Sequence, residues 1–131
     1  MPVSSSVLRV RYAETDKMGV AYYANYFVWF EVGRCDLLRS LGRTYRDLES
    51  QGVMLPVIEA HCEFRESARY DDELSIETCS SLLSQVRIEF SYEIVRRPSQ
   101  IQLATGRTVH ASVDLHGRPL RLPADLQGAL T

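Results

Sequence analysis

One acidic residue stands where its carboxylate could take part in a reaction. Asp16 lies in the segment Glu14-Thr15-Asp16-Lys17-Met18-Gly19-Val20, just ahead of a strongly helical stretch. A carboxylate can attack a carbonyl carbon or activate a water molecule as a general base. The start of a helix carries partial positive charge and unpaired backbone N–H groups, which favour an ionised Asp16 and can donate to an oxyanion. Asp16 is therefore the candidate catalytic residue, although an acidic residue in a turn is also commonly structural.

The residues around Asp16 suggest how a site could form. Gly19 allows the loop to bend, so that the carboxylate and the helix start can face one substrate. Aromatic side chains follow closely, and of these Trp29 and Phe30 are expected in the core, whereas Tyr22 and Tyr23 could equally contact a substrate. Glu31 is three residues before Arg34, a spacing that favours an ion pair on a helix.

Histidine and cysteine offer no competing centre. The histidines lie on predicted strands or in a turn, without a nucleophile or carboxylate at a telling spacing, and are expected to be structural or exposed: His61, His110 and His116. The cysteines are odd in number and widely spaced, which argues against disulfides and favours free thiols in a reducing compartment: Cys35, Cys62 and Cys79. We expect no metal site, because no set such as HExxH is present, and a cytoplasmic location.

Length and charge narrow the class of protein further. The 131 residues suit one domain, 1–131, with a composition that is 45% hydrophobic and 24% charged. The formal net charge of −2 does not favour nucleic acid as a partner. The first residues do not read as a signal peptide, and no apolar run is long enough to span a membrane, so we expect no membrane association.

The hydrophobic pattern predicts an α+β fold. Apolar residues of 24–41 fall in one broad arc of a helix that ends at Gly42, with Gly33 allowing another backbone to approach. Thr44 can cap a second short helix, Tyr45–Gln51.

After these helices, apolar residues recur at every second position, as they do in strands. The predicted strands are Val7–Tyr12, Val53–Arg65, a strand with Leu74, Ile76, Thr78 and Ser80 on one face, Val86–Ile94 and Thr105–Leu115. Short links between the later strands favour antiparallel pairing. An antiparallel sheet with one apolar face needs another element to cover that face. A curved, antiparallel, five-stranded sheet wrapped around one long central helix follows, with a short helix or a frayed tail after Pro123.

The wording of residues 11–26, Arg-Tyr-Ala-Glu-Thr-Asp-Lys-Met-Gly-Val-Ala-Tyr-Tyr-Ala-Asn-Tyr, resembles the hotdog-fold thioesterases of the 4-hydroxybenzoyl-CoA thioesterase family. The resemblance is strongest to small bacterial acyl-CoA thioester hydrolases. Weaker matches are Ala68–Leu74, before a predicted strand, and Gly117–Pro119. The resemblance implies a hotdog fold and hydrolysis of an acyl- or aryl-CoA to free acid and CoA.

The resemblance also implies residue roles. Asp16 corresponds to the catalytic residue, as nucleophile or general base, and the backbone N–H of Tyr23 to the oxyanion donor. Gly19, Val20 and Tyr22 are then expected to contact substrate. No cofactor is implied, because coenzyme A is part of the substrate. Family members are usually homotetramers, dimers of hotdog dimers with sites at the dimer interface.

Arginine side chains near predicted strand ends are candidates for the CoA phosphates, because the guanidinium group suits phosphate oxygens. Arg65, Arg69 and Arg118 are the ones we assign to substrate binding.

Other functions of this fold remain open at this point, because a fold does not fix an activity. A hydratase would typically pair its Asp with a His five residues later, but that position is Ala21. A second thioesterase branch would carry a His-Gly-Gly turn, which is absent. A non-catalytic acyl-CoA-binding or sensor domain is the main alternative.

Overall fold

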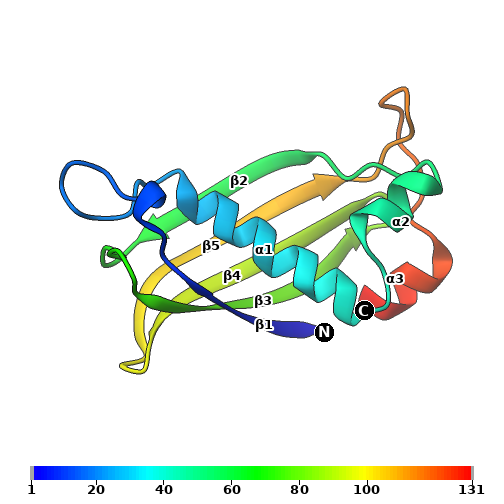
Figure 1. Cartoon of the computed structure of the whole chain (residues 1–131). Helices are drawn as coiled ribbons and strands as arrows, with labels where there is room; N and C mark the ends of the chain where they lie inside the picture. The colour runs from blue at the N-terminus through cyan, green and yellow to red at the C-terminus, as the bar shows by residue number, and fades with distance from the viewer. Residues whose placement is uncertain (1, 131) are drawn as a thin grey trace.

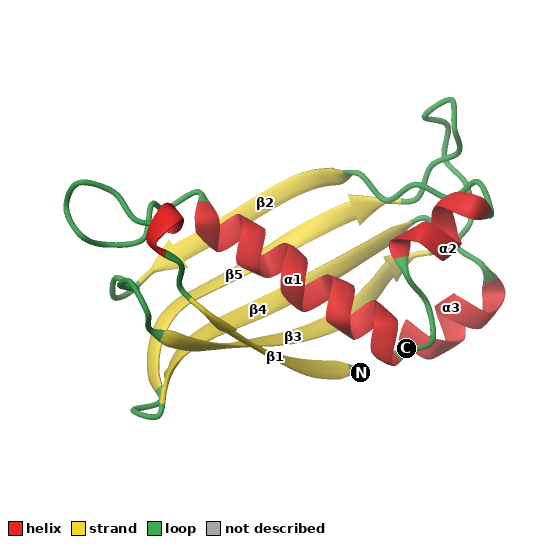
Figure 2. Cartoon of the chain, in the orientation of Figure 1, coloured by secondary structure: helices red, strands yellow, loops and turns green. Residues whose placement is uncertain are grey.

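The computed structural model describes residues 2–130. A long helix lies on one face of a curved antiparallel sheet, and two short helices lie at one end (Figures 1 and 2). The elements are β1 (Val3–Arg9), a 3₁₀ helix η1 (Tyr12–Glu14), α1 (Asn25–Ser40), α2 (Tyr45–Ser50), β2 (Val57–Phe64), β3 (Glu73–Ser84), β4 (Arg87–Arg97), β5 (Ile101–Ala111) and α3 (Ala124–Leu130).

The five strands form one sheet in the order β1-β3-β4-β5-β2, and every neighbouring pair is antiparallel. The alternation that predicted β4 is seen directly, because Ile88, Phe90, Tyr92 and Ile94 point into the core. The ring of Phe30 on α1 stacks on Tyr92 with centroids 4.2 Å apart. The predicted architecture of a curved sheet around one central helix is therefore confirmed.

Helix α1 forms where its apolar arc predicted a helix. Its buried residues include Trp29, Phe30, Leu37 and Leu38. Gly33 also faces the sheet, but the atoms nearest to it are the side chains of Thr78 and Ile76 on β3 rather than a backbone. The close approach was predicted, and side chains instead of main chain make it.

The second helix also forms as predicted. Thr44 Oγ1 accepts a hydrogen bond from the Asp47 N–H at 3.1 Å and caps α2. Gly42 and Gly52 end the two helices with φ of 82° and 83°, a conformation that glycine adopts without steric cost.

Four strands begin or end at other residues than the sequence predicted, among them β4, which runs over Arg87–Arg97 instead of Val86–Ile94. β1 begins at Val3 and ends at Arg9, because the chain turns into η1 where Tyr12 was expected to extend the strand. β2 is shorter than Val53–Arg65 at both ends. β5 runs over Ile101–Ala111 instead of Thr105–Leu115, and Leu115 is 70% exposed in a loop. Alternation of apolar residues continued past the point where strand pairing ends.

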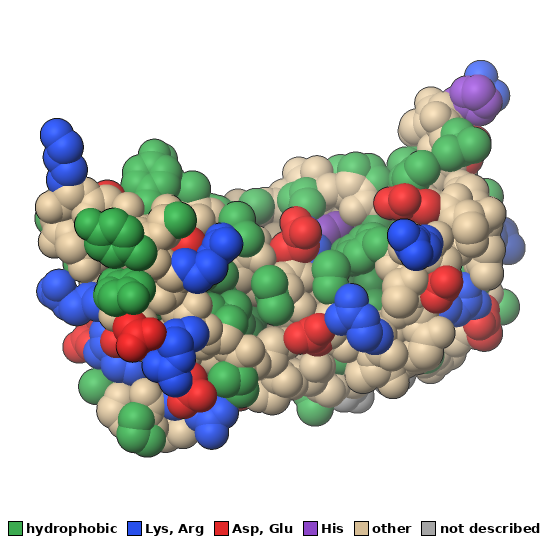
Figure 3. Space-filling model, in the orientation of Figure 1, with side chains coloured by type: hydrophobic (Ala, Val, Ile, Leu, Met, Phe, Trp, Pro, Cys, Tyr) green, Lys and Arg blue, Asp and Glu red, His purple; other side chains and the backbone are tan. Residues whose placement is uncertain are grey.

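The inner face of the sheet is only partly covered. Helix α1 packs against β1, β3 and β4, whereas β2 lies at the free edge and most of its residues are exposed. Val57, Ile58 and Phe64 on β2 are 46%, 44% and 49% exposed, and Val28 on α1 is 49% exposed. Apolar side chains are accordingly visible on the surface that carries α1 and β2 (Figure 3). Among the described residues, no helix is long and apolar enough to cross a bilayer.

Candidate active site

The loop that carries Asp16 is a tight, internally bonded turn. Asp16 Oδ1 accepts a hydrogen bond from the Met18 N–H at 2.9 Å, and the Asp16 carbonyl accepts one from the Gly19 N–H at 3.0 Å. Gly19 has a φ of +80°, which glycine adopts without strain. The Asp16 N–H donates to the Val20 carbonyl at 2.9 Å. These bonds hold Asp16 in place while one carboxylate oxygen, Oδ2, has no hydrogen bond from the described chain.

The chain then enters α1 through a turn that contains Tyr23. The Tyr22 N–H donates to the Glu14 carbonyl, and the Asn25 N–H donates to the Tyr22 carbonyl. Between them, the backbone N–H of Tyr23 donates no hydrogen bond to any described residue. A backbone N–H beside a helix start, free of an internal acceptor, is available to an oxygen of a bound molecule.

Asp16 and Tyr23 line the same pocket, which has a volume of about 270 Å³. Val20 and Ala21 form one wall, and Tyr26 and Phe64 contribute aromatic rings. The segment after β2 closes it with Arg65, Glu66 and Ser67. The Asp16 loop and this segment lie together at one end of the molecule (Figure 1), so residues 16–26 meet residues 64–67 in space.

Aromatic rings pack in and beside the pocket. The Tyr26 and Phe64 centroids are 4.9 Å apart, and the Tyr22 and Tyr23 centroids are 4.8 Å apart. Tyr22 and Tyr23 are 48% and 59% exposed, in contrast to Tyr26. The neighbouring hydroxyl of Tyr23 is the main cause that raises the pKa of Tyr22 above its ordinary value, and the charge of Asp16 adds a smaller effect in the same direction. Tyr23 lines the pocket, whereas Tyr22 does not line it and contacts the ring of Tyr23 from beside it.

A buried carboxylate lies behind the loop. Glu14 is 5% exposed and accepts hydrogen bonds from the Arg11 N–H at 2.8 Å and from the Trp29 indole at 3.0 Å. Burial acts to raise the pKa of Glu14, but these bonds outweigh it and hold the pKa below its ordinary value. Glu14 therefore stays ionised inside the protein.

The arginines assigned to substrate separate into two groups. Arg65 lines the pocket, where it also pairs with Glu63 at 3.1 Å. The backbone of Arg69 forms an isolated β-bridge with Val20, which lines the pocket. Arg118 lies instead in the loop that projects at the opposite end of the molecule (Figure 1). Within one chain, Arg118 and Asp16 do not belong to the same pocket.

Sequence reasoning missed part of the lining. Ala21, Tyr26 and Phe64 line the pocket, as do Glu66 and Ser67. Tyr26 belonged to the helix arc expected in the core, and the residue is indeed 2% exposed, yet it also lines the pocket. The segment 64–67 carries no motif, and only the path of the chain between β2 and β3 brings it to the loop.

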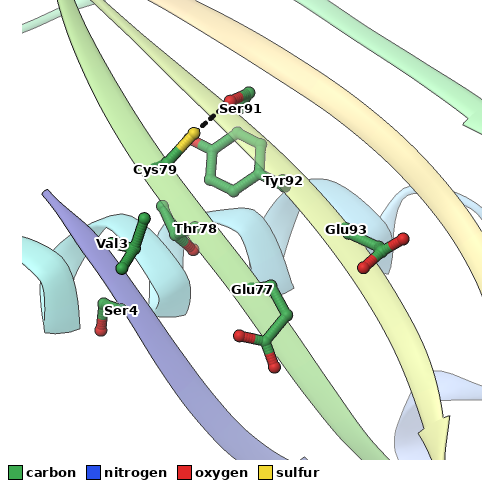
Figure 4. Close-up of a pocket in the computed structure, with 8 residues that line it drawn as sticks. All are labelled: Val3, Ser4, Glu77, Thr78, Cys79, Ser91, Tyr92 and Glu93. Carbon is green, nitrogen blue, oxygen red and sulfur yellow. Dashed lines mark hydrogen bonds between the residues drawn. The ribbon is translucent and has the colours of Figure 1, made fainter. Parts of the chain in front are cut away.

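A larger pocket, of about 350 Å³, lies along β1, β3 and β4 away from Asp16 (Figure 4). Cys79 Sγ lies 2.9 Å from Ser91 Oγ there. Glu77 on β3 lies opposite Glu93 on β4 in the strand register. Its lining contains two carboxylates and no cationic side chain, so it does not suit a phosphorylated ligand. Among residues 2–130, no three His, Cys, Asp or Glu side chains gather in a way that could hold a metal ion.

Comparison with known proteins identifies the family to which this chain belongs. A family model described as the thioesterase-like superfamily matches residues 10–130. The acyl-CoA thioesterase YbgC of Haemophilus influenzae is 32% identical over 124 residues, 93% of this chain and 90% of the relative.

Two solved structures share the whole fold. A DHNA-CoA thioesterase from Staphylococcus aureus has a TM-score of 0.93 and 34% identity, over 98% of this chain and 89% of that chain. A 1,4-dihydroxy-2-naphthoyl-CoA thioesterase from Synechocystis, Slr0204, has a TM-score of 0.92 and 25% identity, over 98% and 95%. The resemblance seen in residues 11–26 is thereby confirmed, and the chain belongs to the thioesterase-like superfamily as a hotdog-fold thioester hydrolase.

Proposed function

We propose that the protein hydrolyses acyl-CoA thioesters, with Asp16 as the catalytic carboxylate and the backbone N–H of Tyr23 as the oxyanion donor. One observation carries the assignment of roles: Asp16 and Tyr23 line one pocket, and neither Asp16 Oδ2 nor the Tyr23 N–H is hydrogen-bonded to a described residue. The thioester carbonyl would lie between them, so that its oxygen faces the N–H and its carbon faces the carboxylate.

Two routes fit this arrangement. In the first, Asp16 accepts a proton from water, the resulting hydroxide attacks the carbonyl, the C–S bond breaks and the CoA thiolate is protonated. In the second, the carboxylate itself attacks, which releases the thiolate and leaves a mixed anhydride that water then hydrolyses. In both, negative charge develops on the carbonyl oxygen, where the Tyr23 N–H would stabilise it. Single-turnover hydrolysis in ¹⁸O-labelled water separates the routes, because only the anhydride route can put label into the Asp16 carboxylate.

An aryl acyl group fits the pocket better than a flexible chain. Rings of Tyr23, Tyr26 and Phe64 line it, and aromatic pairs in such contact gain about 0.5–1.5 kcal/mol beyond area burial. Two structurally similar proteins are named for a dihydroxynaphthoyl-CoA substrate. A panel of benzoyl-, 4-hydroxybenzoyl-, 1,4-dihydroxy-2-naphthoyl- and aliphatic acyl-CoAs, compared by kcat/KM, tests this preference.

Arg65 and Arg69 are proposed to bind CoA phosphates, because they lie in and beside the pocket. Arg118 could reach a CoA in this pocket only from a second copy of the chain, since it lies at the opposite end of its own. Gly19, Val20 and Tyr22 are proposed to contact the reacting part of the substrate from the loop.

A homo-oligomer, built as a dimer of hotdog dimers, is proposed as the working state. The exposed apolar residues of β2 and the uncovered apolar side of α1 form a surface that a second copy would bury. Sedimentation velocity on the wild type and on an Ile58→Lys variant tests this, because a charge at the exposed β2 edge opposes pairing of copies. A monomeric wild type would refute the proposal. A cytoplasmic location is also proposed, and the free state of Cys35, Cys62 and Cys79 supports it.

The central experiment is hydrolysis of acyl-CoA, followed by a chromogenic thiol reagent, for the wild type and for Asp16→Asn. Asparagine keeps the Oδ1 acceptor for the Met18 N–H, so the turn is preserved while the charge is lost. We expect kcat to fall by roughly 10²–10⁴. Asp36→Asn, an Asp on the far part of α1, is the matched control and should retain kcat. Turnover by Asp16→Asn equal to the wild type would refute the role of Asp16. Binding without hydrolysis across the panel would favour an acyl-CoA sensor.

A further inference from the structure

The side chain of Glu14 connects the 3₁₀ helix to the middle of α1. Its Oε1 accepts from the Arg11 N–H at 2.8 Å, and its Oε2 accepts from the Trp29 indole N–H at 3.0 Å. The Arg11 guanidinium lies 3.5 Å from Oε2. Glu14 is 5% exposed and Trp29 is 1% exposed, so this connection is inside the protein and is not exchanged for water.

The backbone of the same residue holds the other end of the loop. The Glu14 carbonyl accepts two hydrogen bonds, from the Tyr22 N–H at 2.8 Å and from Asn25 Nδ2 at 2.9 Å. Thr15 and Ala21 form a β-bridge just inside these bonds. Residue 14 therefore fixes both the point where the loop leaves and the point where it returns to α1.

Glu14 does not touch the pocket that contains Asp16. It lines a different cavity, with Leu8 and Trp29, between α1 and β1. Any effect of Glu14 on the reaction must consequently pass through the loop and the helix. The two carboxylate oxygens each accept an N–H donor, from Arg11 and from the buried Trp29, which a neutral amide cannot do, because its NH₂ would face one of them.

We propose that Glu14 is a positioning residue, which fixes the Asp16 carboxylate against the Tyr23 N–H by anchoring the loop 15–22 to Trp29 on α1. The proposal rests on the thioesterase function proposed above. It predicts that loss of the anchor lowers kcat much more than it raises KM, because the chemistry needs a fixed geometry that binding does not.

The first test is Glu14→Gln, which keeps size and one acceptor oxygen. We expect kcat to fall roughly 10- to 100-fold, with KM changed by less than about threefold. Trp29→Phe, which keeps most of the ring packing but removes the indole N–H, should lower kcat in the same way. In the double variant the two losses should not add, since both act through one hydrogen bond. Glu49→Gln, on the exposed face of α2, is the control and should match the wild type.

Hydrogen exchange separates positioning from general destabilisation. In Glu14→Gln the amide of Tyr22, bonded to the Glu14 carbonyl, should exchange faster, while amides of β3, β4 and β5 keep their wild-type rates. Faster exchange throughout the sheet would overturn the proposal, as would an unchanged kcat in either single variant.

The two proposals fail in different ways. A wild type that hydrolyses acyl-CoA beside a fully active Glu14→Gln refutes only the positioning role. A wild type without any hydrolysis refutes the proposed function and, with it, the kinetic role of Glu14. If Glu14→Gln does not fold, Trp29→Phe alone decides, because full kcat in that variant would overturn the anchor.

Discussion

The hydroxyl of Tyr26 accepts a hydrogen bond from the backbone N–H of Ala68 at 3.1 Å, across 42 positions of sequence. Ala68 is fully buried, and its carbonyl accepts the Ala21 N–H at 2.8 Å. This one residue thus joins the first turn of α1, the Asp16 loop and the segment that follows β2. The pocket exists because these three segments are bonded to each other.

Removal of the Tyr26 hydroxyl should be costly although the ring remains. In Tyr26→Phe the buried Ala68 N–H loses its acceptor, and an unsatisfied buried donor costs about 1–3 kcal/mol. Urea unfolding should show a loss of stability of that size. Tyr70→Phe, whose ring is 57% exposed, should stay within about 0.5 kcal/mol of the wild type. Equal stabilities for the two variants would contradict the importance of this bond.

A chain of buried hydrogen bonds predicts how stability depends on pH. His110 Nδ1 lies 3.0 Å from the Leu55 carbonyl, which can only accept, so Nδ1 carries the proton. Nε2 then accepts from the Thr108 hydroxyl at 2.9 Å, and Thr108 accepts from Tyr92 at 2.6 Å. Burial lowers the pKa of His110 to about 4, and the hydrogen bond to Leu55 only partly opposes this.

The direction of the pH dependence follows from the difference in proton binding between the folded and the unfolded chain. Between pH 6.5 and 4 the unfolded chain binds a proton at His110 that the folded chain does not, so the free energy of unfolding falls as the pH falls. The contribution is complete above pH 6.5 and amounts to roughly 3 kcal/mol. Urea unfolding of the wild type and of His110→Gln at pH 7.5, 6.5, 5.5 and 4.5 should show a flatter slope in the variant. Parallel slopes for the wild type and for His110→Gln would contradict the assignment.

The contact between α1 and β3 at Gly33 predicts an overpacking effect. A Cβ at this position would collide with Thr78 Oγ1 and lie 3.0 Å from Ile76 Cγ2. Overpacking costs about 1–3 kcal/mol, which exceeds the gain of at most about 1 kcal/mol in helix propensity. Gly33→Ala should therefore be destabilised.

Thr78 Oγ1 is buried and has no hydrogen-bond partner among the described residues. Thr78→Ala removes that atom, so Gly33→Ala with Thr78→Ala should be less destabilised than the sum of the two single variants in urea unfolding. Additive losses would show that the collision is relieved elsewhere.

The proposed oxyanion donor can be removed without a change of side chain. An ester in place of the peptide bond between Tyr22 and Tyr23 deletes the Tyr23 N–H, which bonds to no described acceptor, and keeps the Tyr22 carbonyl as a weaker acceptor for the Asn25 N–H. We expect folding to be little affected and kcat to fall by roughly 10²–10³. The same replacement before Tyr70, outside the pocket, is the control. Unchanged turnover would exclude this N–H as the donor.

Much of the fold was predictable from the sequence because burial imposes a period. The apolar arc of α1 and the alternation of β4 are both present in the structure, because each element has one face in the core. Strand ends were less predictable: Leu115 continues the alternation of β5 and yet is 70% exposed. Local pattern does not record where the partner strand stops.

The site was only partly predictable, for a related reason. Asp16, Gly19 and Val20 form a local motif, and a motif can be read directly. Phe64 and Ser67 meet them only through the path of the chain between β2 and β3. Glu14 escaped notice because an acidic residue in a loop gives no sign, in sequence, that it is buried against Trp29.

The free N–H of Tyr23 belongs to the path of the backbone rather than to the tyrosine. Every amino acid except proline presents the same donor at this position, so the side chain there can drift over evolutionary time without loss of the donor. An alanine scan would pass over it, because alanine keeps the group intact. A comparison of side chains between relatives would then record Asp16 but not the backbone N–H of Tyr23, which we propose as the oxyanion donor.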